Sequence, residues 1–325
     1  MPWPSSIAAT APPLTRADDF GPFWVQTLET LADVAPEPAI LQLERGRQGG
    51  PALRWFSVRS LGGKQIVGYL LQWEDPQPRP LVVYTHGYGS QVEEAWSWAR
   101  RGLHVAGFDV RGFGRSHDAA GPLSPHGYVL TGIEDPRTSI LRGAVCDFLR
   151  TYQLARHWLG ATMARTVFHG HSFGGALAIM AAAVGTTPDL LAVGVPTFGW
   201  AQGRRRLVRR GSGKEINDYL AAHPQQEAAV LRTLSYFDPM NFAQRVRCPT
   251  LIGLGLDDDV VPPETVYAII NHLHDAVQVM EFPASHSDRP EEAAWDAFEA
   301  RWLELAVAGP HPRSGARHDA LGQAL

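Results

Sequence analysis

The chain has 325 residues and a mass of 35.6 kDa, a length that fits one α/β domain or two smaller ones. Hydrophobic residues make up 45% and charged residues 19% of the chain, which excludes a disordered or fibrous protein. The net charge of -4 and the isoelectric point near 6.3 give no electrostatic reason to expect nucleic acid as a partner, because phosphate backbones are held mainly by Lys and Arg.

The start of the chain has no basic leader followed by a long apolar run, and no stretch of about 18 apolar residues occurs further along. Cys146 and Cys248 stand in apolar surroundings, which favours two buried thiols over a disulfide. We therefore expect a cytoplasmic protein that does not span a membrane.

The chain predicts a helix and a hairpin before its main sheet. After a proline-rich arm, residues 20–32 carry aromatic residues and Leu at helical spacing, and residues 55–58 and 66–73 have the character of strands. Apolar strands and helix-length segments then alternate, with strands predicted at 81–85, 105–109, 166–169, 191–195, 250–256 and 277–282 and helices at 140–154 and 263–273. This alternation indicates a mostly parallel sheet with helices on both faces, so the predicted fold class is α/β.

A polar and basic segment, residues 199–246, is too long for a single crossover between strands, and we expect a lid or an oligomer contact there. The run RRRLVRR, from Arg204 to Arg210, is favoured as a solvated or salt-bridged helix face, and the alternative is a grip on an acidic substrate. We predict a single catalytic domain over residues 1–308 with this insertion, and a flexible tail over residues 309–325.

The segment TVFHGHSFGGALAIMAAA places a G-x-S-x-G pattern between a short strand and an Ala-rich helix, a context that predicts a nucleophile elbow. Gly170 and Gly174 lack the Cβ atoms that would clash where the strand turns tightly into the helix, so Ser172 can adopt a strained conformation with its hydroxyl presented to the site. The helix N-terminus beneath it favours negative charge. The predicted nucleophile is Ser172.

A serine hydroxyl needs a base to accept its proton and a carboxylate to orient that base. In this fold the order along the chain is Ser, acid, His, and His286 after the last predicted strand is the expected base. Asp257, Asp258 and Asp259 follow the preceding strand, and only one of them can face the imidazole. An Asp followed after two residues by Val-Pro is frequent in this fold, and this pattern selects Asp258.

The oxyanion of the tetrahedral intermediate needs two backbone N–H donors. Phe173 directly follows the nucleophile and supplies one, and Tyr88 in the loop THGYGS is the candidate for the other. The Tyr88 side chain either walls the acyl pocket or packs as a structural aromatic. His86 and Arg111 are expected to be structural. No His, Cys or Asp cluster has metal-ligand spacing and no phosphate loop is present in the sequence, so neither a metal nor a cofactor is predicted.

These residues resemble the acetyl xylan esterases and cephalosporin C deacetylases of carbohydrate esterase family seven, over nearly the whole chain. FGPFWVQTLETL is similar to the family's N-terminal helix, HGYGS to its oxyanion loop, DVRGFG to its Arg-Gly-x-Gly turn, and TLSYFDPMNFAQRVRCPTLIGLGLDDDVVPP to the stretch that carries its acid. The resemblance implies an α/β-hydrolase fold with the triad Ser172, Asp258 and His286 and the oxyanion donors Tyr88 and Phe173. It also implies a ring-like homo-oligomer, such as a hexamer, that takes small acylated substrates.

The chain departs from the family at Phe113 and Phe173, where Gln is usual, at residues 137–140 in place of a Tyr-rich run, and at Ser287 in place of Glu. We expect a serine esterase that removes short acyl groups such as acetate through an acyl-enzyme. The alternatives are a broader carboxylesterase or another hydrolase of this fold, and a non-catalytic binding protein built on the α/β-hydrolase fold.

Overall fold

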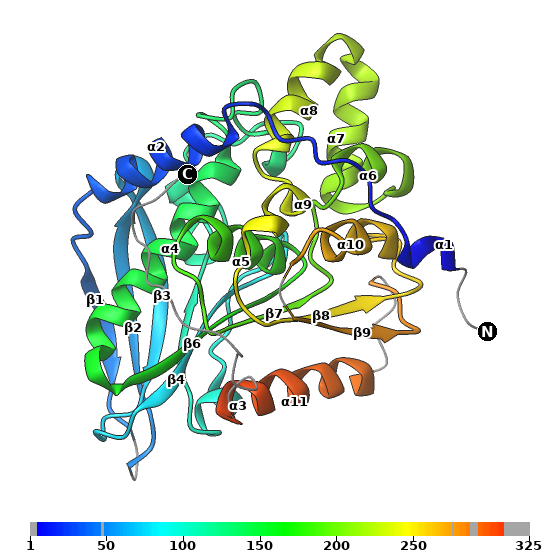
Figure 1. The fold of residues 1–325 in the computed structure, drawn as a ribbon. Helices are drawn as coiled ribbons and strands as arrows, with labels where there is room; N and C mark the ends of the chain where they lie inside the picture. Colours follow the sequence, from blue (N-terminus) through cyan, green and yellow to red (C-terminus); the bar gives the residue numbers. More distant parts are fainter. Residues whose placement is uncertain (1–4, 47–48, 275, 287–291, 309–325) are drawn as a thin grey trace.

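The computed structural model describes residues 5–46, 49–274, 276–286 and 292–308. One nine-stranded sheet in the order β1-β2-β3-β5-β4-β6-β7-β8-β9 crosses the molecule (Figure 1). Its strands are β1 (Ala39–Glu44), β2 (Ala52–Ser60), β3 (Lys64–Gln72), β4 (Arg79–Thr85), β5 (His104–Phe108), β6 (Met163–His171), β7 (Leu190–Gly194), β8 (Thr250–Gly255) and β9 (Val277–Phe282). Three neighbouring pairs are antiparallel: β1 with β2, β2 with β3, and β3 with β5. All remaining pairs are parallel. The α/β prediction is therefore confirmed.

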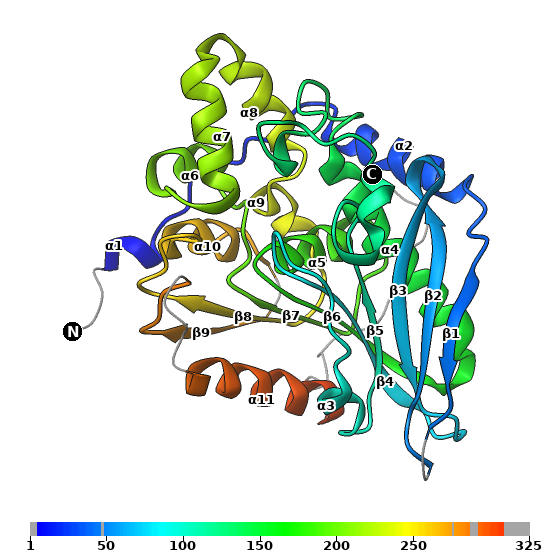
Figure 2. The ribbon, with the colours of Figure 1, turned by 180° about the vertical axis from the view of Figure 1, so that it is seen from behind.

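The parallel strands are apolar because both faces of the sheet are covered. Every residue of β5, β7 and β8 is buried, as expected for strands that lie between two helical layers. One face carries α2 (Phe20–Ala32), α4 (Ile140–Leu159), α5 (Phe173–Val184) and α10 (Pro263–Ile270), and the other carries α3 (Trp96–Ala99) and α11 (Glu292–Ala308) (Figure 2). A separate apolar core lies on each face.

The helix α2 has the bounds that the sequence predicts, and its aromatic residues attach it to the segment before β8. Phe20 packs edge-on against Phe242 with ring centroids 4.9 Å apart, and the Trp24 indole N–H donates to the Tyr236 carbonyl at 3.2 Å. Trp24 is fully buried. Large buried aromatics of this kind contribute much of the apolar area that holds elements together, so α2 supports the end of the insertion.

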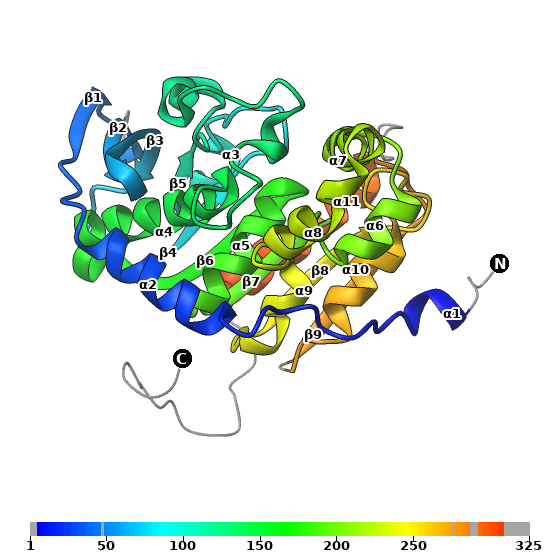
Figure 3. The same ribbon diagram turned by 90° about the horizontal axis from the view of Figure 1, so that it is seen from above.

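The predicted insertion is a group of helices between β7 and β8. It contains α6 (Ala201–Leu207), α7 (Gly211–Ala222), α8 (Glu227–Ser235) and α9 (Pro239–Phe242), which stand above the helical layer beside α10 (Figure 1, Figure 3). Its arginine run does not form one solvated face: Arg206, Arg209 and Arg210 are exposed, but Arg204 is buried. The expectation of a solvated face is therefore wrong for Arg204, because α6 turns that side chain toward the core.

Two N-terminal elements were not predicted from the sequence. α1 (Ser5–Ala8) lies within the proline-rich arm, and β1 pairs with the outer edge of β2. All six residues of β1 are exposed, so no alternation of buried and exposed positions marks it as a strand.

The predicted tail at residues 309–325 lies outside the described residues. Within the described ranges, no helix combines the length and apolar character needed to cross a membrane.

Candidate active site

Ser172 occupies the sharp turn between β6 and α5. Its backbone has φ 53° and ψ -113°, a left-handed conformation that costs a non-glycine residue about 1–3 kcal/mol and recurs at functional sites. The Ser172 N–H donates to the Gly194 carbonyl at 2.9 Å, and the Ser172 carbonyl accepts from Ala176 at 3.0 Å. These bonds hold the strained residue in place at the start of α5.

The two glycines of the pattern make this turn possible. A Cβ on Gly170 would stand 2.3 Å from the Gly174 carbonyl carbon, and one on Gly174 would stand 2.3 Å from the Thr85 carbonyl oxygen. Both contacts are with backbone atoms, which a neighbouring side-chain rotation cannot relieve. Glycine is therefore required at both positions for α5 to pack against β4 and β6.

Asp258 lies beyond the end of β8 and contacts the predicted base. Its Oδ2 is 3.0 Å from His286 Nδ1, and its Oδ1 accepts from the N–H groups of Val260 and Val261 at 2.9 and 2.7 Å. The side chain of Asp258 is only 1% exposed, so these bonds fix the carboxylate in one orientation. A neutral His286 that donates from Nδ1 has Nε2 available to accept a proton.

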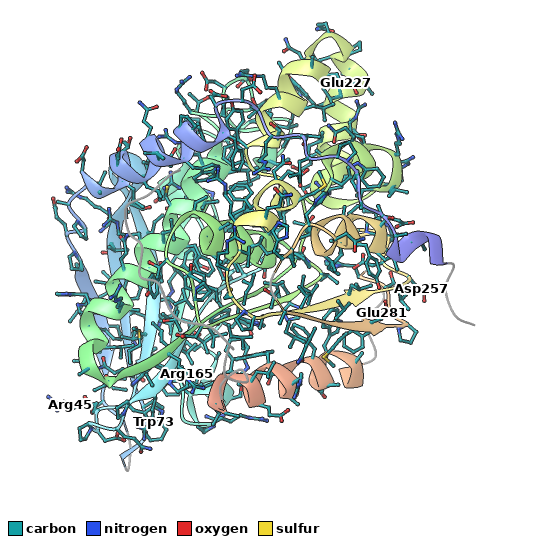
Figure 4. The ribbon with its side chains drawn as sticks, viewed as in Figure 1. Arg45, Trp73, Arg165, Glu227, Asp257 and Glu281 are labelled. Carbon is teal, nitrogen blue, oxygen red and sulfur yellow. The ribbon has the colours of Figure 1, made fainter. Side chains whose placement is uncertain are left out.

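Asp257 and Asp259, the other two acids of the run, have different partners from Asp258. Asp259 lies 3.2 Å from Arg210 in an ion pair in which both side chains are about half exposed or more. The Asp257 N–H donates to the Ala284 carbonyl at 3.2 Å, and Figure 4 labels Asp257 beyond the end of β8 beside α10. The hydrogen-bond geometry therefore distinguishes Asp258 from both of its neighbours.

His286 lies close to the residue that precedes the predicted nucleophile. Burial, and to a smaller extent the electrostatic interaction with His286, lowers the pKa of His171 to about 4. The His171 ring packs edge-on against Trp295 with centroids 5.0 Å apart. Within the described residues, no hydrogen bond joins the Ser172 hydroxyl to His286. Such bonds are often long in unliganded enzymes and tighten when substrate binds.

His86 orients the peptide bond that presents the Tyr88 N–H. The Val110 N–H donates to His86 Nε2 at 3.1 Å, so this nitrogen carries no proton, and His86 Nδ1 donates to the Gly87 carbonyl at 2.8 Å. Burial lowers the pKa of His86, which favours this neutral form. Because the C=O and N–H of a trans peptide point in opposite directions, holding the Gly87 carbonyl also fixes the direction of the Tyr88 N–H.

The Tyr88 side chain connects the oxyanion loop to the insertion. Its hydroxyl donates to Glu215 Oε2 of α7 at 2.6 Å and accepts from the Val129 N–H at 3.0 Å. Burial raises the pKa of Tyr88, and the hydrogen bond to Glu215 raises it further, so the phenol stays protonated. The Tyr88 ring also packs edge-on against Phe173, with centroids 5.7 Å apart. Both roles considered for this side chain are thus compatible with its position.

Arg111 has the structural role that the sequence predicts. Its guanidinium donates to both carboxylate oxygens of Asp147 on α4, at 2.9 and 2.6 Å, and to the Leu61 carbonyl at 3.3 Å. Both charged side chains are buried. This pair anchors the turn after β5 to α4.

Among the residues that the structure describes, no group of three or more His, Cys, Asp or Glu side chains could hold a metal ion.

Sequence reasoning missed the contact of Glu215 with this site and the burial of Arg204. Glu215 lies within the insertion and carries no local motif, so nothing in the sequence connects it to Tyr88, which is 127 residues away. Arg204 was recognised only as part of a basic run, and no spacing rule separates a buried arginine from exposed ones in a short helix.

The fold and the strand–turn–helix at Ser172 define the class of the protein: it is an α/β hydrolase. Residues 8–299 match the acetyl xylan esterase family. The chain therefore belongs to the acetyl xylan esterase family, a family of carboxylic ester hydrolases.

Solved structures agree with this assignment. An acetyl xylan esterase from Paenibacillus sp. R4 superposes with a TM-score of 0.82 at 28% identity, covering 92% of this chain and 99% of that one. Acetyl xylan esterase 1 from Thermoanaerobacterium sp. has a TM-score of 0.84 at 22% identity, covering 94% and 99%, and this likeness concerns the fold. An acetyl esterase of Xylanibacter ruminicola is 29% identical over 75 residues, which span 23% of this chain and 16% of that protein.

Proposed function

We propose that the protein is a serine esterase that hydrolyses short acyl esters, with acetate as the preferred acyl group. The hydrogen bond between Asp258 and His286, next to the strained Ser172, is the observation that carries the proposal. The family assignment supports ester chemistry, and the names of the relatives, acetyl xylan esterase and acetyl esterase, favour acetate.

The mechanism is a two-step acyl transfer. The Ser172 oxygen attacks the ester carbonyl while His286 accepts its proton, and Asp258 holds the imidazole and stabilises its positive charge. The N–H groups of Tyr88 and Phe173 stabilise the oxyanion of the tetrahedral intermediate. His286 then protonates the departing alcohol. Water, deprotonated by His286, releases the carboxylic acid and restores Ser172.

An aromatic cluster beside the predicted nucleophile supports a preference for small acyl groups. The Phe173 ring has ring-centroid distances of 5.6 to 6.4 Å to its four aromatic neighbours, which are Tyr88, Phe113, Tyr128 and Phe198. Phe173 directly follows Ser172 in the chain, so the cluster is anchored at the residue next to the predicted nucleophile. We infer that they limit the length of the acyl chain.

The direct test measures hydrolysis of p-nitrophenyl acetate by wild type and Ser172→Ala. We expect the variant to lose activity by about 10⁴-fold or more. Ser60→Ala is a matched control, since Ser60 is a fully buried serine on β2. Activity that persists in Ser172→Ala would contradict the proposal and would favour a binding protein with incidental hydrolysis.

The acyl preference is tested separately, with p-nitrophenyl esters from acetate to octanoate and with acetylated xylo-oligosaccharides. We expect kcat/KM to fall as the acyl chain lengthens. Comparable turnover of acetate and octanoate would instead indicate a broader carboxylesterase.

We also infer that the protein forms a homo-oligomer and that residues 1–308 act as one catalytic domain. The edge strand β1 supports the first inference, because Ile40, Leu41 and Leu43 are each 50–54% exposed on a strand with one unpaired edge. Light scattering should give a mass that is a multiple of 35.6 kDa. A monomer at micromolar concentration would contradict the oligomer.

A further inference from the structure

Asp109 directly follows β5 and lies buried between two loops of the candidate site. Only 2% of its surface is exposed. Its Oδ1 accepts from the Val92 N–H at 2.7 Å, and its Oδ2 accepts from the Arg115 N–H at 2.7 Å. Hydrogen bonds to a carboxylate are shorter and stronger than those between neutral groups. One side chain therefore joins the segment after β4 to the turn after β5.

The segment after β4, residues 86–95, contains the oxyanion loop and lies against the predicted nucleophile. A Cβ on Gly87 would stand 4.0 Å from the Ser172 Cβ. Residues 86–95 form no helix or strand, so no regular ladder of backbone hydrogen bonds fixes their path. The position of the segment therefore depends on the side chains that bond to its backbone.

Two of these side chains hold the backbone on either side of Tyr88. His86 holds the Gly87 carbonyl before it at 2.8 Å, and Asp109 holds the Val92 N–H after it at 2.7 Å. Displacement of either anchor would move the peptide that carries the Tyr88 N–H. Asp109 is thus placed to act on the predicted oxyanion donor without touching it.

The far end of the segment has an anchor of its own. The Tyr69 hydroxyl donates to the Glu93 carbonyl at 2.9 Å and accepts from the Ala95 N–H at 2.8 Å. These bonds connect the segment to β3 and do not involve Asp109. Loss of the Asp109 carboxylate would therefore loosen the part of the segment next to Tyr88 while the far end stays attached.

The turn after β5 is shaped around the Asp109 carboxylate. Gly114 has φ 47°, and a Cβ at this position would stand 2.4 Å from both the carboxyl carbon and Oδ2 of Asp109. A side chain on residue 114 would therefore displace the carboxylate. This close approach explains the second glycine of the turn RGFG, residues 111–114.

The charge of Asp109 is held by the backbone of the two loops. Among the residues that the structure describes, its ion-pair contact is with His86 Nε2 at 3.9 Å. His86 is neutral in this arrangement, because the same nitrogen accepts from the Val110 N–H. Asp147, by contrast, is equally buried and pairs with the Arg111 guanidinium. A buried carboxylate is costly unless it is well bonded, so the bonds to both loops are needed to hold Asp109 in place.

We propose that Asp109 is a positioning residue for the oxyanion hole. Its carboxylate fixes Val92 and, through it, the peptide that presents the Tyr88 N–H to the oxyanion of the tetrahedral intermediate. Oxyanion donors stabilise the transition state because they are aligned before the charge develops. The inference rests on the proposed ester hydrolysis at Ser172.

The test compares Asp109→Asn with Thr85→Val. Asp109→Asn keeps the shape of the side chain but replaces one acceptor oxygen by an NH₂ group, which cannot accept from a backbone N–H. Thr85→Val is the matched control, because Thr85 is also 2% exposed and its hydroxyl donates to the Phe108 carbonyl at 2.7 Å, a bond between neighbouring strands.

Four quantities are measured for each enzyme. They are kcat and KM for p-nitrophenyl acetate, the Ki of 2,2,2-trifluoroacetophenone, and Tm. The ketone forms a tetrahedral adduct with a reactive serine, so its Ki reports on the oxyanion hole as an analogue of the transition state does.

We expect Asp109→Asn to lower kcat by about 10- to 100-fold and to leave KM within about 3-fold, because a misplaced donor affects the transition state more than the bound ester. The Ki of the ketone should rise by a similar factor, since its adduct carries the same oxyanion. Thr85→Val should lower Tm through the loss of one buried hydrogen bond and leave kcat, KM and Ki within about 3-fold.

Amide hydrogen exchange of the wild type gives a measurement that does not depend on how the variants fold. The Val92 amide should exchange much more slowly than in a peptide of the same sequence. If Asp109→Asn does not fold, Gly114→Ala takes its place, because its Cβ displaces the carboxylate without removing it. The same direction of change in kcat and Ki is expected.

Two results would overturn the inference. One is rapid exchange of the Val92 amide in the folded wild type. The other is a folded variant in which Tm falls but kcat and Ki do not change, as expected for a purely structural aspartate. Either result contradicts only the role of Asp109 if hydrolysis still depends on Ser172. Hydrolysis that does not need Ser172 would contradict the proposed function itself.

Discussion

At the scale of single residues, Asp258 and Asp259 are adjacent and differ in all of their surroundings. Asp258 is buried, accepts two backbone N–H bonds and contacts His286, whereas Asp259 forms a solvated ion pair with Arg210. A buried and fully bonded carboxylate can hold an imidazole in one orientation. A solvated ion pair of this kind is typically worth less than 1 kcal/mol.

This contrast predicts different outcomes for one chemical change at two neighbouring positions. Asp258→Asn should lower kcat on p-nitrophenyl acetate by about 10³- to 10⁴-fold, because the amide favours the wrong tautomer of His286. Asp259→Asn should stay within about 3-fold of wild type. Steady-state kinetics of both variants measures this, and equal losses would mean that the acid has been misassigned.

The sequence could predict most of the site at this scale because each predicted residue follows a strand. Ser172, Asp258 and His286 all lie just beyond carboxyl ends of parallel strands, which share one edge of a sheet. The direction of a side chain is a different matter. Whether Arg204 points inward depends on how α6 packs on α7, and no local pattern encodes that contact.

At the scale of elements, the insertion and the oxyanion loop are joined through one side chain. Glu215 of α7 accepts from the Tyr88 hydroxyl, and the N–H of the same Tyr88 is a predicted oxyanion donor. The η4 turn (Tyr128–Leu130) contributes the Val129 N–H to this hydroxyl. We infer that α7 helps to position the oxyanion loop.

We therefore expect Glu215→Ala and Tyr88→Phe each to lower kcat by about 10- to 100-fold, with a smaller change in KM, because small displacements of a catalytic group are costly. The double variant should fall no further than either single variant, since both changes remove the same bond. Asp218→Asn is the control, because Asp218 lies on the same helix and pairs with Lys214 at the surface. Additive losses would show that the two residues act separately.

Buried strands and α2 could be predicted from the sequence, whereas the exposed strand β1 could not. Strands buried on both faces and the amphipathic α2 carry strong patterns, and their positions agree with the prediction. β1 is exposed throughout, so its pairing with β2 comes from backbone hydrogen bonds that leave no trace in the residue pattern.

At the scale of the whole molecule, buried histidines make stability depend on pH. His104 is fully buried, its Nδ1 accepts from the Trp73 N–H at 3.3 Å, and burial lowers its pKa to about 4. Burial likewise lowers the pKa of His171 to about 4. Both rings are neutral in the folded protein, whereas in the unfolded chain they titrate near pH ~6.5.

These pKa values determine whether the free energy of unfolding rises or falls with pH. Above pH ~6.5 both states are neutral and stability is unaffected, but below it the unfolded chain binds protons that the folded protein does not. The free energy of unfolding should therefore fall as the pH decreases toward about 4, by up to about 1.4 kcal/mol per pH unit for each such histidine.

Urea unfolding at a series of pH values between about 4 and about 6.5 measures how steeply the free energy of unfolding depends on pH. His104→Gln should flatten it by up to the contribution of one proton, whereas His117→Gln, at an exposed position, should not. An unchanged slope in His104→Gln would mean that His104 is not held neutral.

The central claim of this account is that Ser172 is the nucleophile, and covalent labelling tests it most directly. Treatment with a fluorophosphonate, followed by intact-mass measurement and peptide mapping, should place a single adduct on Ser172. Asp258→Asn should slow the labelling, because activation of Ser172 depends on an oriented His286. An adduct on another residue, or no adduct on a folded protein that hydrolyses p-nitrophenyl acetate, would contradict the account.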